Sequence, residues 1–244
     1  MKEGNFLENI RSILLWGVGL LHFFIVFLLI GSGLLLFPAH RIYPLVRLLA
    51  RSQLRIMGVR LHVTGLNNFD HQRPFLIMGN HESMFDVFAM PAVIPMFWVG
   101  VEASYHFAMP FWGWLVKRWG NIPINRANIT TAKASLDRAG QVIRSGVSIV
   151  ILPEGHRTLT GELGEFKKGP FHLAHAAQAD ILPFVMKGLF HYNKKGSRIL
   201  RPTNVIVKFG QPLPYTSFKD SSVEILRQRV RKVMLDLLDF NQDG

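Results

Sequence analysis

Hydrophobic residues are concentrated near the start of the chain, where residues 13–37 form an apolar run whose one ionisable side chain is His22. In a helix these 25 residues are long enough to cross a bilayer core of about 30 Å. A cleaved secretory signal has a shorter apolar region and a small-residue cleavage site, so we expect the segment to be retained. Its length fits a single membrane span, whereas glycines near both ends also allow a bent hairpin within one leaflet.

A basic helical pattern follows the apolar run. Arg47, Arg51 and Arg55 recur every four residues within residues 42–57, so they share one face of a helix. This pattern is typical of a basic helix on an anionic membrane, although the solvated face of an ordinary helix has the same arginine spacing. Because arginines after the apolar run outnumber the basic residues before it, we expect the rest of the protein to face the cytoplasm from the cytoplasmic membrane.

Beyond residue 60 the apolar runs become short and alternate with helical patterns. Such alternation is typical of an α/β fold with a mixed, largely parallel sheet flanked by helices. We therefore divide the chain into an N-terminal membrane anchor, residues 1–59, and an α/β domain, residues 60–244. The predicted strands cover residues 61–65, 74–78, 97–100, 121–125, 148–153, 181–186 and 204–210. The predicted helices follow His81, cover residues 105–118, 128–145 and 170–178, and end with one helix near the C-terminus.

The final helix has the clearest local signals. Ser221 and Glu224 have the spacing of a capping box, in which each side chain binds the backbone amide of the other. Apolar residues recur at intervals of three and four along this helix, so one face is expected to pack on the sheet. Arg227 and Arg231 are then expected to face outward.

Composition narrows the possible partners. The 244 residues include 28 Lys+Arg and 16 Asp+Glu, a formal charge of +12, and 49% of the residues are hydrophobic. The positive charge favours anionic partners such as acidic lipid head groups, phosphorylated substrates or nucleic acid, and the apolar content favours lipid among them. No nucleic-acid-binding motif is present. The absence of cysteine excludes disulfides, thiolate catalysis and thiolate metal ligands.

The main candidate for chemistry is an imidazole and a carboxylate five residues apart, His81 and Asp86. Five steps of a helix put two side chains on different faces, so His81 is expected just before a helix and Asp86 in its first turns. There the carboxylate accepts the imidazole Nδ1–H, which leaves Nε2 free as a general base. The pair alone is weak evidence, since this spacing also arises by chance.

Further polar residues follow predicted strands. Glu154, Gly155 and Arg157 come directly after the fifth strand, and ligands collect beyond the carboxyl ends of strands in open α/β sheets. Arg126 ends the fourth strand, and its planar guanidinium group suits a phosphate. Lys167 belongs to a basic segment before a helix whose N-terminal amides favour an anion. Each feature alone is also common in exposed turns.

Together these residues resemble the four ordered motifs of the glycerolipid acyltransferases, above all those of the lysophosphatidic acid acyltransferase group. The motifs are Asn-His-x4-Asp at 80–86, Gly-x-Ile-x-Ile-x-Arg at 120–126, Pro-Glu-Gly-x-Arg at 153–157 and Ile-Leu-Pro-Phe at 181–184. The likeness covers residues 60–215. Any one motif is weak evidence, but four in this order and spacing are specific.

The resemblance implies a role for each matching residue. His81 is the base and Asp86 is its partner. Residues implied to bind the acceptor or other parts of the substrates are Arg126, Glu154, Gly155, Arg157, Lys117 and Lys167. Two positions depart from the family, since Asn125 stands where an Asp is common and His156 stands where a Thr is usual.

The implied activity is transfer of a fatty acyl group from acyl-CoA or acyl-carrier protein to the free hydroxyl of a lysophospholipid. The preferred acceptor is 1-acyl-glycerol-3-phosphate, which gives phosphatidic acid. The two departures leave a zwitterionic lysophospholipid or glycerol 3-phosphate open as the acceptor. The acyl donor is a co-substrate, so no cofactor or metal ion is expected.

Three other questions stay open at this level. Ser83 as a nucleophile would make the protein an acyl-enzyme hydrolase, although the nucleophile-elbow motif is missing. A non-catalytic protein that binds anionic lipid is a second alternative, against which the intact His81 and Asp86 speak. A run of aromatic and apolar residues fits either a packed core or a contact with acyl chains or the membrane interface. It comprises Phe107, Met109, Phe111, Trp112, Trp114 and Leu115.

Overall fold

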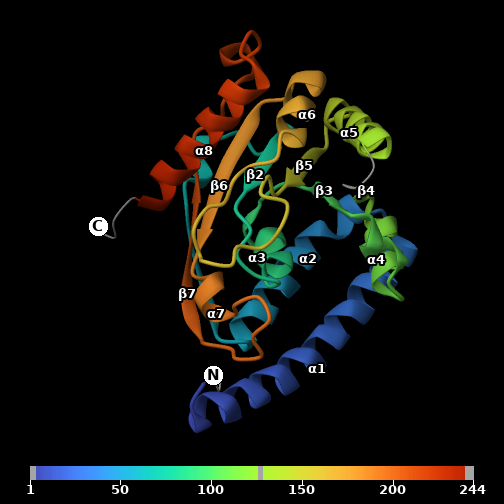
Figure 1. Ribbon diagram of the computed structural model, residues 1–244. Helices are drawn as coiled ribbons and strands as arrows, with labels where there is room; N and C mark the ends of the chain where they lie inside the picture. Colours follow the sequence, from blue (N-terminus) through green and yellow to red (C-terminus); the bar gives the residue numbers. More distant parts are fainter. Residues whose placement is uncertain (1–3, 126–128, 240–244) are drawn as a thin grey trace.

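The computed structural model describes residues 4–125 and 129–239 of the chain. Within these residues a seven-stranded sheet forms the centre of the molecule, in the order β1-β7-β6-β2-β5-β3-β4 (Figure 1). Neighbouring strands are parallel except β6 and β7, which pair antiparallel. The predicted mixed, largely parallel sheet is therefore confirmed. The strands are β1 (Val59–Thr64), β2 (Leu76–Gly79), β3 (Trp98–Ala103), β4 (Ile122–Ile124), β5 (Ser148–Ile151), β6 (Ile181–Lys187) and β7 (Thr203–Phe209).

Helices cover both faces of the sheet. The crossover from β2 to β3 runs in one direction along the sheet, and the crossovers from β4 to β5 and from β5 to β6 run in the other. Because such crossovers are right-handed, α3 lies on one face of the sheet, and α5 and α6 lie on the opposite face. On these two faces α2 packs against α3, and α8 packs against β6 and α6. The helices are α1 (Phe6–Leu36), α2 (Ala39–Ile56), α3 (Asp86–Val93), α4 (Trp112–Trp119), α5 (Ile129–Arg144), α6 (Gly169–Ala177), α7 (Leu189–Tyr192) and α8 (Val223–Asp239). Short 3-10 helices are η1 (Leu66–Asn68), η2 (Ser104–Ala108) and η3 (Tyr215–Ser217).

The central strands form the most deeply packed part of the domain. Every residue of β2 and β5 is buried, and so are all residues of β6 except the last. Strands covered by helices on both faces are apolar at nearly every position, which explains why the sequence has uninterrupted apolar runs here. The loops that leave β2 and β5 therefore start from a fixed framework.

The apolar N-terminal segment is one continuous helix of 31 residues, α1. It begins before the apolar run because Asn5 and Glu8 form a capping box, with the Glu8 amide 2.8 Å from Asn5 Oδ1 and the Asn5 amide 2.9 Å from Glu8 Oε2. Among the described residues it is the one helix long and apolar enough to cross a membrane. The helix continues through all its glycines, so the bent-hairpin alternative is wrong.

α1 lies along the α/β domain and does not stand away from it (Figure 1). Near its start, the Leu200 amide donates to Ser12 Oγ at 2.9 Å. Near its end, Arg118 Nε donates to the Leu34 carbonyl at 2.9 Å. One side of α1 is thus packed against protein at both ends, while the other side exposes large apolar side chains to the surroundings.

α2 differs from the basic membrane helix that the arginine spacing predicted. Arg51 Nε donates to the Ala92 carbonyl at 2.8 Å, and Arg47 Nη1 lies 3.5 Å from the Pro95 carbonyl oxygen. The Ala92 carbonyl is in the last turn of α3, where cations are favourable because the helix dipole is negative there, and Pro95 follows the helix by two residues. The prediction of a membrane-facing arginine row is therefore wrong for Arg47, which is half-buried, whereas Arg51 and Arg55 are exposed and it stays a prediction for them.

The start of α8 also differs in detail from the prediction. Ser222, one residue later than expected, caps the helix, since its Oγ accepts a hydrogen bond from the Ile225 amide at 3.2 Å. Glu224 binds the side chain of Arg227 at 2.6 Å. The predicted capping box between Ser221 and Glu224 is therefore wrong. The helix begins one residue later than predicted, so Ser222 and the Ile225 amide have the three-residue spacing of an N-cap.

Candidate active site

The carboxyl ends of β2 and β5 meet at a topological switch point. These strands are adjacent and parallel, but the chain leaves β2 toward α3 on one face and β5 toward α6 on the other. In α/β sheets such an arrangement opens a crevice beyond the strand ends, where ligands bind. His81 follows the end of β2 by two residues, and Glu154 follows the end of β5 by three. The fold thus brings the first and third motifs to one edge of the sheet.

His81 and Asp86 form a hydrogen-bonded pair at this edge. Nδ1 of His81 lies 2.5 Å from Oδ2 of Asp86, and Asp86 is the first residue of α3. Asp86 is only 1% exposed, whereas His81 is half-buried. Nε2 of His81 has no hydrogen-bond partner among the residues that the structure describes. The ring is therefore oriented with one nitrogen free to take a proton from a substrate.

Backbone amides complete the surroundings of the Asp86 carboxylate. Oδ2 accepts a hydrogen bond from the Glu82 amide at 2.9 Å, and both oxygens lie 3.2 Å from the Ser83 amide. Burial raises the pKa of the Asp86 carboxyl, while the hydrogen bonds from His81 and from the two amides act in the opposite direction. These donors favour the ionised carboxylate, which fixes the imidazole tautomer and stabilises its protonated form.

The His81 turn, residues 80–83, is tied to the end of β6 and the segment after it. Asn80 pairs with both backbone groups of Met186, donating from Nδ2 to the carbonyl and accepting at Oδ1 from the amide, each at 2.7 Å. Glu82 Oε2 accepts hydrogen bonds from the amides of Gly188 and Phe190 at 3.0 and 3.1 Å. These contacts hold the His81 turn against the sheet from one side.

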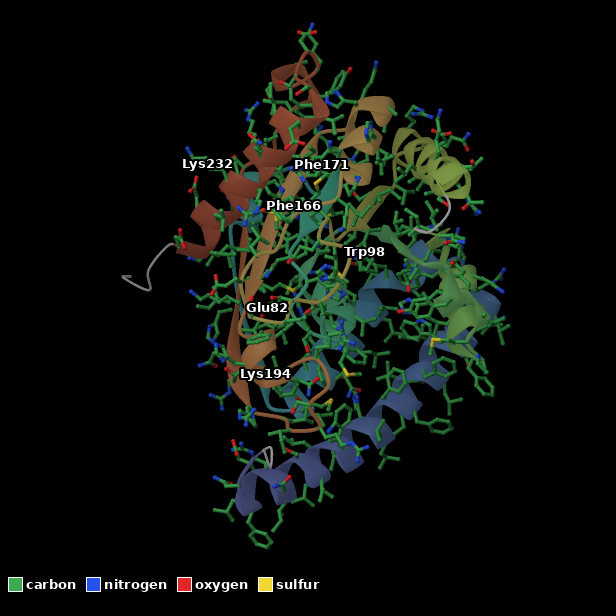
Figure 2. All side chains as sticks on the ribbon, in the orientation of Figure 1. Glu82, Trp98, Phe166, Phe171, Lys194 and Lys232 are labelled. Carbon is green, nitrogen blue, oxygen red and sulfur yellow. The ribbon has the colours of Figure 1, made fainter. Side chains whose placement is uncertain are left out.

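Glu82 is a buried acid in the His81 turn, four residues before Asp86 in the sequence (Figure 2). Burial raises the pKa of Glu82 to about 8, and the nearby charge of Asp86 adds to the increase. The amide donors at Gly188 and Phe190 act in the opposite direction and do not offset the burial. Glu82 is therefore mainly protonated at neutral pH, so it adds little negative charge beside His81.

Ser83 does not have the environment of a nucleophile. Its side chain is buried, and its hydroxyl donates a hydrogen bond to the Asn193 carbonyl at 3.0 Å. An activated serine needs a base that accepts its hydroxyl proton, and here a backbone carbonyl accepts it. The acyl-enzyme hydrolase alternative therefore has no geometric support.

Glu154 holds the backbone of His81 from the other side. Its Oε1 accepts a hydrogen bond from the His81 amide at 2.7 Å, and its Oε2 accepts one from the Gly164 amide at 2.8 Å. A Cβ atom at Gly164 would lie 3.0 Å from Oε2, so glycine allows this close approach. Burial raises the pKa of Glu154, and the two amides oppose the shift. These contacts give Glu154 a positioning role, while the acceptor-binding role implied by the resemblance stays a prediction.

The C-terminal helix reaches the same network through two arginines. Arg231 donates from Nε to the Gly164 carbonyl at 3.2 Å and from Nη2 to the Leu163 carbonyl at 3.0 Å. Arg227 Nη1 donates to the Phe166 carbonyl at 3.0 Å. The prediction that these arginines face outward is therefore wrong, because their long side chains fold back over the loop after β5.

Three other predicted residues lie in the loop after β5, which binds the His81 turn through hydrogen bonds. Gly155 has a φ of 78°, the left-handed conformation that favours glycine, and it makes the sharp turn expected after β5. Arg157 is half-buried and precedes the residue whose amide donates to the His81 carbonyl at 2.8 Å. Lys167 is exposed, and its amide donates to the Pro153 carbonyl at 2.8 Å.

Two predicted residues are not joined to this cluster. Lys117 is exposed on α4, and no described contact links it to His81. Arg126 follows β4 in the sequence but lies outside the described residues. Their roles in substrate binding stay predictions.

Glu82 and Arg231 were not predicted from the sequence as parts of the site. The available signal for Glu82 was its position inside the motif, between a buried strand and an apolar helix, where an ionisable residue needs specific partners. Arg231 has no comparable signal, because its contact joins segments that are far apart in the sequence.

Comparison with known proteins agrees with this architecture. A family model described as Acyltransferase matches residues 60–187, which is more than half of the chain. The chain therefore belongs to the acyltransferase family. It is an acyltransferase, and the non-catalytic alternative is set aside.

Named relatives fall within one group. The chain is 29% identical over 194 residues to the 1-acyl-sn-glycerol-3-phosphate acyltransferase alpha of Ovis aries, a match that covers 78% of this chain and 67% of that protein. It is 30% identical over 159 residues to the 1-acyl-sn-glycerol-3-phosphate acyltransferase of Limnanthes douglasii, covering 65% of this chain and 56% of that protein. The crystal structure of the 1-acyl-sn-glycerophosphate (LPA) acyltransferase PlsC from Thermotoga maritima has the same fold, with a TM-score of 0.80 and 21% identity over 96% of this chain and 99% of that chain.

Proposed function

We propose that the protein transfers a fatty acyl group from acyl-CoA or acyl-carrier protein to the free hydroxyl of lysophosphatidic acid, which gives phosphatidic acid. The observation that carries this proposal is the His81–Asp86 pair, whose free Nε2 lies at the edge of the sheet where substrates collect. The printed names of the relatives support this acceptor. The acyl donor is a co-substrate, and the proposal needs no cofactor.

The reaction needs a base but no protein nucleophile. Nε2 of His81 takes the proton of the acceptor hydroxyl as its oxygen attacks the carbonyl carbon of the acyl thioester. A carbon–oxygen bond forms, and the carbonyl becomes an anionic tetrahedral intermediate. When this intermediate collapses, the carbon–sulfur bond breaks, and the protonated imidazole returns its proton to the leaving thiolate. Asp86 stabilises the imidazolium between the two proton transfers.

The phosphate of the acceptor has candidate cations near the His81 turn. The guanidinium group of Arg157 has no hydrogen bond among the described residues, and Lys167 is exposed on the same loop. The sequence adds Arg126 after β4. The Glu154 carboxylate accepts hydrogen bonds from two backbone amides. It is therefore turned toward protein donors and away from an anionic lysolipid substrate.

We also propose that α1 lies in one leaflet of the cytoplasmic membrane, with the α/β domain on the cytoplasmic side. α1 packs on the domain at both ends, so a span along the membrane normal would pull charged parts of the domain into the bilayer. An orientation in the membrane plane buries its exposed apolar side and keeps the domain in water. The Trp16 and Phe85 rings are 5.9 Å apart, so α1 runs beside the His81 turn. An acceptor can therefore reach the site from the membrane.

Purified protein in detergent tests the acceptor and the donor. It would be given lysophosphatidic acid, lysophosphatidylcholine and glycerol 3-phosphate, each with acyl-CoA and with acyl-carrier protein, and the products would be identified by mass spectrometry. We expect phosphatidic acid to form most efficiently and His81→Ala to form almost none. Transfer only to lysophosphatidylcholine would move the assignment to a zwitterionic acceptor.

Membrane washing and protease protection test the attachment. High salt is expected to leave the protein on membranes, since apolar burial is not screened as charge contacts are. A protease outside sealed inverted vesicles should digest the α/β domain, whereas protection would contradict the cytoplasmic orientation.

A further inference from the structure

Phe111 has a strained backbone. Its φ and ψ are 60° and −55°, and the Trp112 amide donates to the Pro110 carbonyl at 2.6 Å. These values describe a γ-turn with positive φ, which is rare and strained for a residue that has a side chain. Phe111 and Gln178 are the two residues other than glycine with positive φ in the part of the chain that the structure describes. Such strain persists only where the surrounding structure enforces it, and it often serves a function.

The turn does not bury Phe111. The residue is 77% exposed, and Tyr105 is 68% exposed on the same segment. Met109 and Trp114 are also exposed, so the core alternative for the aromatic run is wrong at these positions. Leaving several large apolar side chains in water is unfavourable, and a contiguous group of them marks an interaction surface. We call this group, which comprises Tyr105, Met109, Phe111 and Trp114, the aromatic patch.

The aromatic patch continues the exposed side of α1. The rings of Phe111 and Phe27 are 6.5 Å apart and nearly perpendicular. A Cβ atom on Gly31 would lie 3.7 Å from the Trp114 ring, an ordinary van der Waals distance, so the Trp114 ring lies against α1. Exposed Phe24 is one turn before Phe27 on α1. The apolar surface that we assign to the membrane therefore extends from α1 onto the segment before α4.

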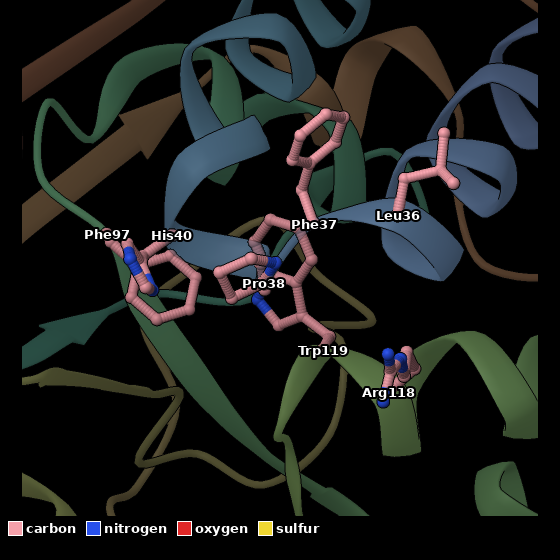
Figure 3. Close-up of a pocket in the computed structure, with 8 residues that line it drawn as sticks. Leu36, Phe37, Pro38, His40, Phe97, Arg118 and Trp119 are labelled. Carbon is pink, nitrogen blue, oxygen red and sulfur yellow. The ribbon is translucent and has the colours of Figure 1, made fainter.

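Basic groups lie beside the aromatic patch. Lys117 and Arg118 are in the last turn of α4 and are exposed. A hollow of about 470 Å³ separates this turn from the corner between α1 and α2, and Phe37, His40 and Arg118 are among its lining residues (Figure 3). Aromatic side chains with adjacent cations are typical of protein surfaces at the level of lipid head groups.

We propose that the aromatic patch is a second membrane contact, in which Phe111 enters the same leaflet as α1 while Lys117 and Arg118 face anionic lipid head groups. The inference rests on the in-plane attachment of α1 proposed above. The continuity with α1 and the adjacent positive charge favour a lipid surface over a protein partner. The γ-turn then has a purpose, since it projects the Phe111 ring from the start of α4 toward the acyl chains. Two contacts, one on a long helix and one beside it, would also prevent α1 from rolling about its axis.

The lack of cysteine allows a direct test. Single cysteines would be introduced by Phe111→Cys, by Leu21→Cys on the exposed side of α1, and by Ile225→Cys on α8. Leu21 and Ile225 are matched controls, since both are exposed and apolar, and the start of α8 is far from α1 (Figure 1). Each variant would carry an environment-sensitive fluorophore and be reconstituted in phosphatidylcholine vesicles that contain phosphatidylglycerol. Lipids with a quencher on the acyl chain then report which labels enter the leaflet.

We expect quenching at positions 111 and 21 and none at position 225. Quenching at 21 without quenching at 111 would overturn this inference and leave the attachment of α1 intact. No quenching at either position would overturn both proposals. Equal quenching at all three positions would mean that the label itself enters the membrane, and this would also overturn the inference. A second copy of the chain on the patch would give disulfide-linked Phe111→Cys dimers and no quenching at 111, which would contradict a lipid contact.

A second variant separates lipid binding from folding. Phe111→Gly removes the ring and also relieves the positive φ, so the thermal midpoint should not fall. Spontaneous transfer of this variant between vesicles should become roughly ten-fold faster, as expected from losing the burial of one Phe side chain. Phe111→Leu is the matched control and should transfer nearly as slowly as the unchanged protein. An unchanged transfer rate for Phe111→Gly would contradict the proposal.

Discussion

Oε1 of Glu154 lies 2.7 Å from the backbone nitrogen of His81. The third motif thus binds the first through the main chain and not through the imidazole. The imidazole has its own partner, since Asp86 accepts its Nδ1 hydrogen. Two buried carboxyl groups therefore have separate tasks, one fixing where the residue lies and the other fixing how its ring is turned.

Removing either member of the proposed catalytic pair, His81 and Asp86, should reduce the rate more than it reduces stability. His81→Ala removes the general base, and the expected loss in kcat is about 10²–10⁴-fold. Asp86→Asn should cause a comparable loss, because the amide does not stabilise the imidazolium and can favour the wrong tautomer. The measurement is kcat in detergent on protein whose folding is checked by circular dichroism. Near-normal transfer by folded His81→Ala would exclude the mechanism proposed here.

Glu154→Gln tests the support of the His81 backbone. Two amides, of His81 and Gly164, need an acceptor at this position, and a glutamine offers only one oxygen. One amide then faces an NH2 group, which costs about 1–3 kcal/mol. We expect a lower thermal midpoint and a kcat about ten- to a hundred-fold lower, since the His81 turn loses its fixed position. Glu162→Gln is the matched control on the exposed part of the same loop, and an equal loss in both variants would remove this role from Glu154.

The fold was predictable because its signals are local. β2, β5 and β6 are buried on both faces, so each forms an apolar run that ends at a turn residue. α7 was not predicted, because four residues do not complete enough of a helical period to be distinguished from a loop. The position of α7 depends on Glu82, whose side chain accepts hydrogen bonds from the amides of Gly188 and Phe190 at the start of this helix. These contacts join segments that are far apart in the sequence.

The site was predictable only where it is local. His81 and Asp86 are five residues apart, so their spacing and the helix start determine their contact. Glu154 lies beside His81 because β2 and β5 are neighbours in the sheet, and this strand order is not local in the sequence. The Pro-Glu-Gly-x-Arg motif also does not specify which atoms of the two residues are in contact. The outward prediction for Arg231 failed because helical periodicity assigns a Cβ direction, whereas a long side chain can fold back to reach a carbonyl.

Arg231→Ala tests whether the C-terminal helix supports catalysis. The change removes two hydrogen bonds to the loop whose Gly164 amide binds Glu154. We expect kcat to fall several-fold, which corresponds to about 1 kcal/mol, and the KM for the acceptor to change little. Arg231→Lys should recover part of the activity, since one donor is restored. Arg229→Ala is the control, because exposed Arg229 binds the Ser217 carbonyl and, within the described residues, has no hydrogen bond or ion pair with the loop after β5. If the loss of kcat is no larger than the loss of folded protein, Arg231 contributes to stability and not to catalysis.

Arg126 tests the choice of acceptor, although it lies outside the described residues. If its guanidinium group binds the acceptor phosphate, Arg126→Ala removes a charge-assisted contact of about 1.5–3 kcal/mol, which lowers acceptor kcat/KM about ten- to a hundred-fold. Donor KM should change far less, and Arg126→Lys should recover part of the loss.

The loss from Arg126→Ala should be larger for lysophosphatidic acid, a phosphate monoester, than for lysophosphatidylcholine, a diester whose choline crowds the guanidinium group. Equal losses for both acceptors would remove Arg126 from the phosphate site. A loss confined to donor KM would place it on the thioester side.

Glu82 should make stability depend on pH in an unusual direction for a carboxyl group. Burial raises its pKa from the ordinary 4.5 to about 8. Between these values the folded protein keeps a proton that the unfolded chain has lost, so unfolding releases a proton and stability falls as the pH rises. The contribution is fully present below the unfolded pKa and is lost as the pH rises through the folded pKa, with a slope of at most about 1.4 kcal/mol per pH unit.

Glu82→Gln keeps the neutral shape and the acceptor oxygen for Gly188 and Phe190 but cannot ionise. The free energy of unfolding of this variant, minus that of the unchanged protein, should therefore increase from about pH 5 to pH 9. Subtracting the two curves removes the contribution of Glu154, whose raised pKa is common to both proteins, and leaves that of Glu82 together with its interaction with Asp86. Denaturant unfolding in detergent at several pH values gives the difference. A flat difference for Glu82→Gln would mean that Glu82 is already ionised inside the fold, and two negative charges would then lie beside His81.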